Sequence, residues 1–185
     1  MQIAAAQADL HRAYTDGGPG IIVSALVWFV AGLTLQQAGL ATAFAVLFFG
    51  GMGIFPAALF LNRVVLARTG EGRDNPFGKL VLESTIAMIA GLFAAYLFLP
   101  TAPGLMMPVA AIAVGAHFFV FRTAYGDNRF WLMAAVLTGI GAMGLFGPKL
   151  DAVPLVFAFA GAELLFGIWL TVTGLRNESG SAPTN

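Results

Sequence analysis

The sequence predicts an all-α membrane protein, a bundle of six transmembrane helices with both termini in the cytoplasm. Its composition, its long apolar segments and its distribution of Lys and Arg each point to this class. The 185 residues are 59% hydrophobic and 10% charged, with a mean hydropathy of +0.86. Soluble domains are about 25% charged, and a chain of this length leaves about 30% of its unfolded surface exposed after folding. That remaining surface therefore needs an apolar solvent.

Six apolar segments are long enough to cross a membrane. A hydrocarbon core of about 30 Å takes about 20 helical residues. The six segments lie at 19–36, 40–61, 77–99, 104–121, 130–146 and 152–175. They predict a transmembrane domain over residues 19–175.

Capping and turn residues separate these segments. Pro19 falls in the first turn of the first helix, where its missing N–H costs nothing. Asn75 is a predicted cap, and Pro76 is the predicted first residue of the third helix. The stretches "LPTAPG" and "GPKLDAVP" supply the turns before the fourth and sixth helices.

The two ends of the chain are predicted to lie outside the membrane. Residues 1–18 form a cytoplasmic segment, in which the apolar spacing of 3–14 fits either a short interfacial helix or a frayed tail. Residues 176–185 have no apolar periodicity and are expected to be a disordered cytoplasmic tail.

The basic residues predict the orientation. Eight of the nine fall in the N-terminal segment, the second–third loop, the fourth–fifth loop or the C-terminal tail, and Lys149 alone falls on the other side. Under the positive-inside rule the eight-residue side is cytoplasmic, so we expect a protein of the cytoplasmic (plasma) membrane with both termini inside. The topology anchors are Arg63, Arg68, Arg73, Lys79, Arg122 and Arg129.

Several functional classes find no support in the sequence. A net charge of zero gives no reason to expect nucleic-acid binding. The chain has no cysteine, which excludes disulfides and thiolate chemistry. We find no Walker loop, HExxH, GxSxG or carboxylate cluster. No catalytic residue, metal or cofactor is predicted; the expected partner is the lipid bilayer, together with a homo-oligomer formed through glycine-rich helices such as "TGIGAMGLFG".

Glu163 is the most informative polar residue, because it lies in the middle of the sixth helix. An ionisable group at this depth is costly and is a functional candidate by default. No basic residue in any predicted span matches its depth. Glu163 is therefore either a carboxyl group in a substrate or ion pathway, or a neutral group that hydrogen-bonds between helices.

Glu83 and His117 are the other two pathway candidates. Glu83 shares a helical face with the small residues Ala87, Ala90, Gly91 and Ala94, which predicts that it faces the bundle, and Lys79 one turn earlier could pair with it. His117 lies five residues before Arg122, so Arg122 marks the water line and His117 points into the protein below it. Either residue can also be structural.

The second helix contains a candidate break. The stretch "FFGGMGIFP" at 48–56 places Gly50, Gly51 and Gly53 shortly before Pro56, which predicts a kink or local unwinding. Broken helices often line binding sites in membrane proteins, because the freed backbone groups need partners.

Three segments carry a family resemblance: "FFGGMGIFP" at 48–56, "DNPFGKL" at 74–80 and "VGAHFFVFRTAYG" at 114–126. Together they resemble an uncharacterised family of small six-helix bacterial membrane proteins, over nearly the whole chain. The resemblance implies no activity, substrate or cofactor. It implies that the following residues stand in family-like segments: Gly50, Gly51, Pro56, Asn75, Pro76, Gly115 and His117.

Three functions are compatible with these features. The first is a small transporter or channel, with a polar path from Glu83 and His117 to Glu163. The second is a membrane assembly or lipid-interacting protein whose polar residues are structural. The third is an intramembrane enzyme with Glu83 and His117 as an acid/base pair, which requires the two side chains within hydrogen-bond reach.

Overall fold

The structure, a computed structural model, describes residues 2–147 and 151–179, and this part of the chain is helical without strands. Six of its segments are long and apolar enough to cross a membrane, which confirms the predicted all-α, six-helix class. The elements, in chain order, are α1 Ile3–Tyr14, the 3₁₀ turn Thr15–Gly17, α2 Gly18–Ala38, α3 Leu40–Phe60, the π-helical turn Leu61–Val65, α4 Pro76–Tyr96, the 3₁₀ turn Pro103–Leu105, α5 Met106–Tyr125, α6 Arg129–Phe146 and α7 Ala152–Ser179.

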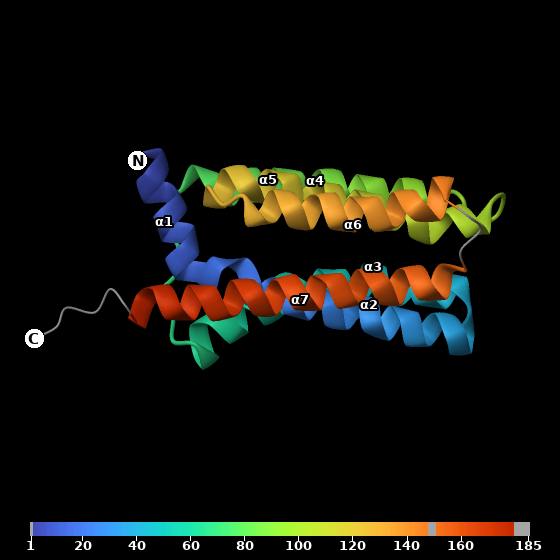
Figure 1. Cartoon of the computed structure of the whole chain (residues 1–185), viewed down its shortest axis with the longest axis horizontal. Helices are drawn as coiled ribbons and strands as arrows, with labels where there is room; N and C mark the ends of the chain where they lie inside the picture. The colour runs from blue at the N-terminus through green and yellow to red at the C-terminus, as the bar shows by residue number, and fades with distance from the viewer. Residues whose placement is uncertain (1, 148–150, 180–185) are drawn as a thin grey trace, which may run out of the picture.

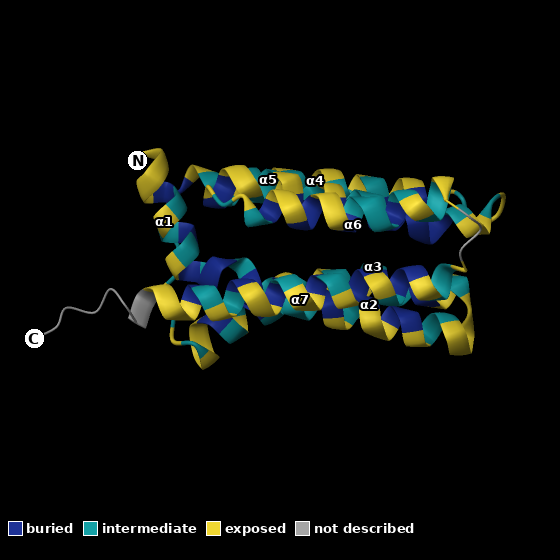
Figure 2. Cartoon of the chain, viewed as in Figure 1, coloured by how far each residue is buried: buried dark blue, intermediate teal, exposed yellow. Residues whose placement is uncertain are grey.

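The six long helices form two layers of three (Figure 1). Helices α2, α3 and α7 make one layer, and α4, α5 and α6 make the other. The layers meet mainly where α7 packs against α6 and α5. Large apolar residues such as Phe49 and Leu165 are exposed, as a surface in contact with lipid requires, and exposed residues recur along the long helices (Figure 2).

Glycine allows close packing inside each layer. A Cβ on Gly167 of α7 would lie 2.9 Å from the backbone nitrogen of Ile22 in α2. A Cβ on Gly115 of α5 would lie 2.5 Å from the backbone nitrogen of Thr138 in α6. Both distances are too short for a real Cβ, so the helices touch backbone to backbone, as small residues permit in membranes.

Helix α1 lies across one end of the bundle (Figure 1), with Ala6, Leu10 and Ala13 buried against it. The chain turns from α1 into α2 through Thr15, Asp16 and Gly17, whose φ angles are 49°, 56° and 77°. Two non-glycine residues in the left-handed region cost about 1–3 kcal/mol each. Hydrogen bonds hold them, because Thr15 donates to Asn62 and Asp16 accepts from Arg129.

The third span begins with the cap and the proline that the sequence predicts. The side chain of Asn75 accepts a hydrogen bond of 3.0 Å from the backbone nitrogen of Phe77, and Pro76 begins α4. Pro19 lies in the first turn of α2, as its missing N–H predicts. Of the nine basic residues, the eight that the structure describes belong to elements at the α1 end; Lys149 lies outside the described residues. The side of the membrane that this end faces stays a prediction.

Two helices differ in part from the sequence expectations. Helix α3 is continuous through Gly50, Gly51, Gly53 and Pro56, so it does not unwind there, and a kink at Pro56 stays a prediction; the departure from α-geometry comes later, in the π-helical turn Leu61–Val65. An unsatisfied backbone group in lipid costs several kcal/mol, which favours a continuous helix even though Pro56 has no N–H to donate. Helix α7 continues to Ser179, so 176–179 are helical rather than disordered; Arg176 in the last turn complements the helix dipole.

Candidate functional site

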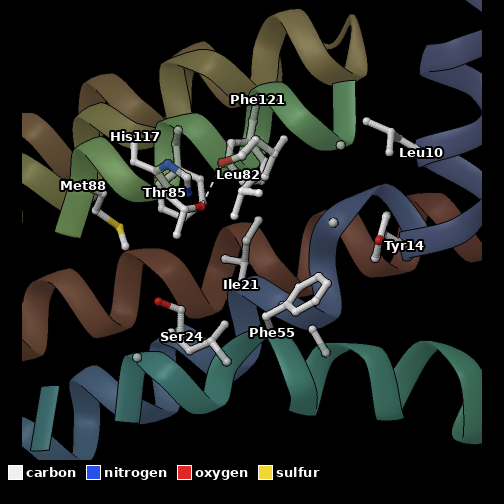
Figure 3. Close-up of a pocket in the computed structure, with 18 of the residues that line it drawn as sticks. Leu10, Tyr14, Ile21, Ser24, Phe55, Leu82, Thr85, Met88, His117 and Phe121 are labelled. Atoms are coloured by element: carbon white, nitrogen blue, oxygen red, sulfur yellow. Dashed lines mark hydrogen bonds between the residues drawn. The ribbon is translucent and has the colours of Figure 1, made fainter. Parts of the chain in front are cut away.

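A cavity of about 610 Å³ separates the two layers in the half of the bundle next to α1 (Figure 3). It is lined by residues 20–28 of α2, 47–58 of α3, 78–92 of α4 and 114–125 of α5. Farther from α1, α3 and α4 meet through aromatic rings, with centroid distances of 5.6 Å for Phe44–Tyr96 and 5.3 Å for Phe48–Phe93. The lining on α4 therefore extends as far as Leu92, one residue before the first of these rings.

Polarity falls along the cavity from α1 inward. The end next to α1 is lined by polar and charged side chains: Tyr14, Asn62, Glu71, Arg73, Asn75 and Lys79. The middle has three polar side chains, Ser24, Thr85 and His117, among apolar residues. The innermost part is apolar: Val27, Trp28, Leu47, Met88, Leu92 and Val114. This gradient matches that of half a membrane.

The cavity also reaches the side of the bundle between α3 and α4. Phe55 of α3 and Leu82 of α4 both line it (Figure 3), and they are 61% and 60% exposed. Side chains that line a cavity and are also largely exposed mark an opening. In a membrane this opening faces the lipid.

His117 lies in the cavity wall, and its ring is fixed by α4. Its Nδ1 lies 2.6 Å from Ser84 Oγ, and Ser84 Oγ donates to the His117 carbonyl oxygen at 3.3 Å. Nδ1–H donating to Oγ satisfies both contacts at once. This arrangement leaves Nε2, which has no hydrogen-bond partner in the described structure, as an acceptor for a molecule in the cavity.

Glu163 lies behind the cavity wall. Ser24, which lines the cavity, donates a hydrogen bond of 2.9 Å to Glu163 Oε1. Glu163 is fully buried, and its Oε2 has no hydrogen-bond partner among the described residues. The carboxyl group is thus separated from the cavity by one hydroxyl.

Glu83 does not join this group. It is exposed on α4, as are Ala87, Ala90 and Ala94, so most of the small-residue stripe expected to face the bundle faces outward. Gly91 of that stripe does pack inside, since a Cβ there would meet Ala113 of α5 at 2.7 Å. Among the described residues Glu83 forms no ion pair with Lys79 and no hydrogen bond with His117. The hydrogen-bond partner of His117 is the next residue, Ser84.

The three glycines of α3 have different surroundings. Gly51 lines it, and a Cβ there would meet nothing within 4 Å. Gly53 is equally open but does not line the cavity. A Cβ on Gly50 would lie 2.8 Å from Val27 of α2, so Gly50 is a packing residue. Of the α6 glycines, Gly141 packs on Ile112 and Pro108 of α5, and Gly144 packs on Leu155 of α7 as well as on Pro108.

The charged groups at the cavity mouth differ in whether they have partners. Burial raises the pKa of the Glu71 carboxyl, an effect that the Tyr14 hydroxyl partly offsets. Arg73 and Lys79 are exposed, and neither forms an ion pair or a side-chain hydrogen bond within the described residues. The mouth thus presents two unpaired cations.

The other predicted anchors have local partners. Arg68 donates to Thr15 Oγ1 at 3.2 Å, and Arg122 donates to Asn128 and lies 5.7 Å from the ring centroid of Trp131. Arg63 lies beside Gly70 in the loop between α3 and α4. These residues hold the loops at this end of the bundle.

A polar cluster that the sequence did not predict ties α1 to both layers. His11 contacts Asp16 Oδ1 through Nδ1 and the Tyr125 carbonyl oxygen through Nε2, both at 2.7 Å. Arg129 of α6 donates to Asp16 Oδ2 at 2.9 Å and to Asp127. Both ring nitrogens of His11 face acceptors, which only an imidazolium can satisfy. Asp16 and Arg129 are 113 residues apart in the sequence, so no local pattern could predict that they form an ion pair.

The described residues contain no group of three or more His, Asp or Glu side chains that could hold a metal ion. The fold and the cavity define the class of the molecule. It is a polytopic helical membrane protein with an internal cavity that opens at one end and toward the lipid.

The chain belongs to a family of unknown function (DUF7010), whose model matches residues 3–173. This match confirms the resemblance to an uncharacterised family. No curated protein and no solved structure matches the chain.

Proposed function

We propose that the protein is a small transporter that binds a membrane-soluble molecule in the cavity between its two layers. The observation that carries this proposal is the one-sided cavity of about 610 Å³, open at the α1 end and closed at the other. Ligand sites commonly have volumes of about 300–1,000 Å³, apolar walls and a few placed polar groups. Ser24, Thr85 and His117 are such groups here.

Transport needs the cavity to open alternately to each side, and the layered arrangement favours such a motion. In each layer one pair of helices, α2 with α7 and α5 with α6, is held together by backbone contacts at glycine, which resist deformation. The layers themselves meet through side chains, including the aromatic pairs of α3 and α4. Two stiff layers that rock against each other around a central site form a known transport geometry.

Glu163 is the proposed proton- or cation-binding group of this transporter. Its Oε1 is one hydrogen bond from the cavity through Ser24, and its Oε2 has no partner in the described structure. A carboxyl group with a free position in a dry interior can gain or lose a proton when the cavity changes its contents.

Thiol labelling tests the cavity, because the chain has no cysteine of its own. Thr85→Cys, in the cavity wall, is expected to react with a membrane-impermeant maleimide from the α1 side. Ile86→Cys is the matched control, since Ile86 is 59% exposed on the same helix but does not line the cavity. A folded Thr85→Cys variant that reacts from neither side would refute a water-accessible cavity.

A second position tests the alternation. Met107 is fully buried in the half beyond the cavity. A transporter predicts that Met107→Cys reacts slowly from the side opposite α1, with a pH dependence that Glu163→Gln abolishes. If Met107→Cys never reacts, the protein does not alternate; if its pH dependence survives Glu163→Gln, the role of the carboxyl group is excluded.

A membrane assembly protein is the second candidate, favoured by the outward-facing stripe of Glu83, Ala87, Ala90 and Ala94. An ionisable group in contact with lipid gains from a protein partner, and small residues allow close approach of a second helix. Ala90→Leu would then dissociate a homo-oligomer in cross-linking experiments, whereas Ala116→Leu, also exposed, would not. The enzyme hypothesis has no comparable support, since His117 contacts Ser84 and not Glu83.

A further inference from the structure

We propose that the molecule bound in the cavity is an amphiphile with one hydrocarbon chain and an anionic headgroup. The headgroup lies between Arg73 and Lys79, and the chain extends inward to Trp28. This inference rests on the proposed function, because it names the class of molecule that the same cavity binds.

The shape and the polarity of the cavity favour a chain over a compact molecule. From Lys79 to Leu92 its wall follows α4 for 13 residues, about 20 Å at 1.5 Å per residue. Polar groups line the mouth and apolar groups the inner end, so a molecule with one polar and one apolar end satisfies both. A volume of about 610 Å³ is that of a drug-sized ligand site, which suits one chain rather than two.

The charge of the mouth selects the sign of the headgroup. Arg73 and Lys79 line the cavity without any ion pair in the described structure, whereas Arg12 at the same end pairs with Asp9 at 2.5 Å. Glu71 is the one carboxylate among the lining residues, and the Tyr14 hydroxyl and Arg63 lie close to it. Two free cations against one partnered carboxylate attract an anion, with guanidinium and ammonium both suited to phosphate, sulfate or carboxylate.

The opening between α3 and α4 supplies the route. Phe55 and Leu82 line the cavity and are exposed toward the lipid. An amphiphile in the adjacent leaflet can slide its chain through this opening while its headgroup stays at the water line, so the charge never crosses the hydrocarbon. A free inorganic anion would need only the mouth and would leave the apolar part of the cavity unused.

Trp28 provides the measurement, because it is 1% exposed and lines the inner end of the cavity. The other tryptophans, Trp131 and Trp169, are 57% and 44% exposed and can be replaced with phenylalanine. The probes are single-chain lipids brominated at the chain end, with either a phosphate or a phosphocholine headgroup, in nanodiscs of zwitterionic lipid. Bromine quenches tryptophan emission on contact, so quenching reports a chain that reaches Trp28.

The phosphate probe is expected to quench Trp28 saturably, and the phosphocholine probe much more weakly. The double variant Arg73→Gln/Lys79→Gln should bind the phosphate probe roughly tenfold or more weakly, since each basic residue near the surface contributes about 1 kcal/mol. Arg122→Gln/Arg176→Gln is the matched control, because both residues are exposed at the same end and neither lines the cavity. Competition by inorganic phosphate alone would identify a free anion as the ligand and overturn the amphiphile.

The remaining outcomes separate this inference from the proposed function. Equal saturable quenching by both headgroups leaves the cavity as a chain-binding site but overturns the anionic selectivity. Unchanged affinity in the Arg73→Gln/Lys79→Gln variant overturns the assignment of the headgroup site. If neither probe quenches Trp28 above the level in the Gly51→Phe variant, which fills the cavity, no chain enters and the proposed function fails with the inference.

Discussion

The contact between α2 and α7 and the contact between the two layers are built in opposite ways. Where α7 crosses α2, Gly167 brings the backbones together, and a Cβ would lie 2.9 Å from the nitrogen of Ile22. Between the layers, α3 and α4 meet through the aromatic pairs Phe44–Tyr96 and Phe48–Phe93 in one part and line a cavity in the other. The interface between α2 and α7 is closely packed, whereas the interface between the layers contains a cavity that could close.

This difference shows how a small membrane protein can be stiff and still move. In lipid there is no hydrophobic force between helices, so close packing and interhelical hydrogen bonds hold them together. Backbone contact at glycine gives each layer one good arrangement. The layers meet instead through side chains, mainly where α7 packs against α6 and α5, and through polar contacts at the α1 end such as Arg129 with Asp16.

The largest effect should come from closing the tight interface. Gly167→Val places branched carbons where Ile22 already lies, and we expect a loss of about 3 kcal/mol or more, or no folded protein. Gly139→Val is the matched control, since a Cβ there meets nothing within 4 Å and should cost less than about 1 kcal/mol. Unfolding in mixed micelles by denaturant measures both. Similar losses for the two variants would contradict the distinction between the interfaces.

An intermediate effect should come from the polar tie between the layers. Asp16 is 3% exposed and accepts from both His11 and Arg129. Asp16→Asn tolerates the left-handed backbone at this position but removes the charge, which should cost about 2–3 kcal/mol. Without the interactions of Asp16 with His11 and Arg129, α1 should also become cleavable by protease added to the α1 side.

Asp74→Asn is the control for this variant, because Asp74 is exposed at the same end and has no such partners. Equal stability and equal protease resistance of the two variants would show that α1 is held by its apolar face alone.

The smallest effect concerns the charge at the cavity mouth. Burial raises the pKa of Glu71 above its ordinary value of 4.5. Its stabilising contribution is therefore complete below the ordinary pKa and is lost as the pH rises through the raised pKa. Over the same range the carboxylate forms and opposes an anionic ligand.

For a sulfate-headed probe, whose own charge stays constant, the wild-type affinity should rise as the pH falls through the Glu71 pKa. Glu71→Gln should bind about fivefold more tightly at pH 7.5 and lose this pH dependence, if one charge near the surface contributes about 1 kcal/mol. Trp28 quenching measures both, and Asp74→Asn serves as the control. A pH dependence that persists in Glu71→Gln would assign it to another group.

Local residues predicted much of the fold but little of the site. Pro76 and Asn75 begin α4 as their backbone chemistry requires, and the depth of Glu163 follows from counting residues. The sequence could not predict which face of α4 packs against the bundle. Glu83 lies on the same face as several alanines, and alanine suits contact with either a neighbouring helix or lipid. Nothing local could place Ser24 against Glu163, 139 residues away.

The sequence by itself determined that this chain is a six-helix membrane protein of a particular length and charge distribution. Those properties follow from hydropathy summed over each span and from capping at each end, and both are local. Only the tertiary structure decided that Glu83 faces outward, that α3 stays helical through Pro56, and that the layers leave a cavity beside His117. In a membrane protein most faces of a helix are equally apolar, so hydropathy does not indicate which face contacts other helices. The packing of whole helices decides this.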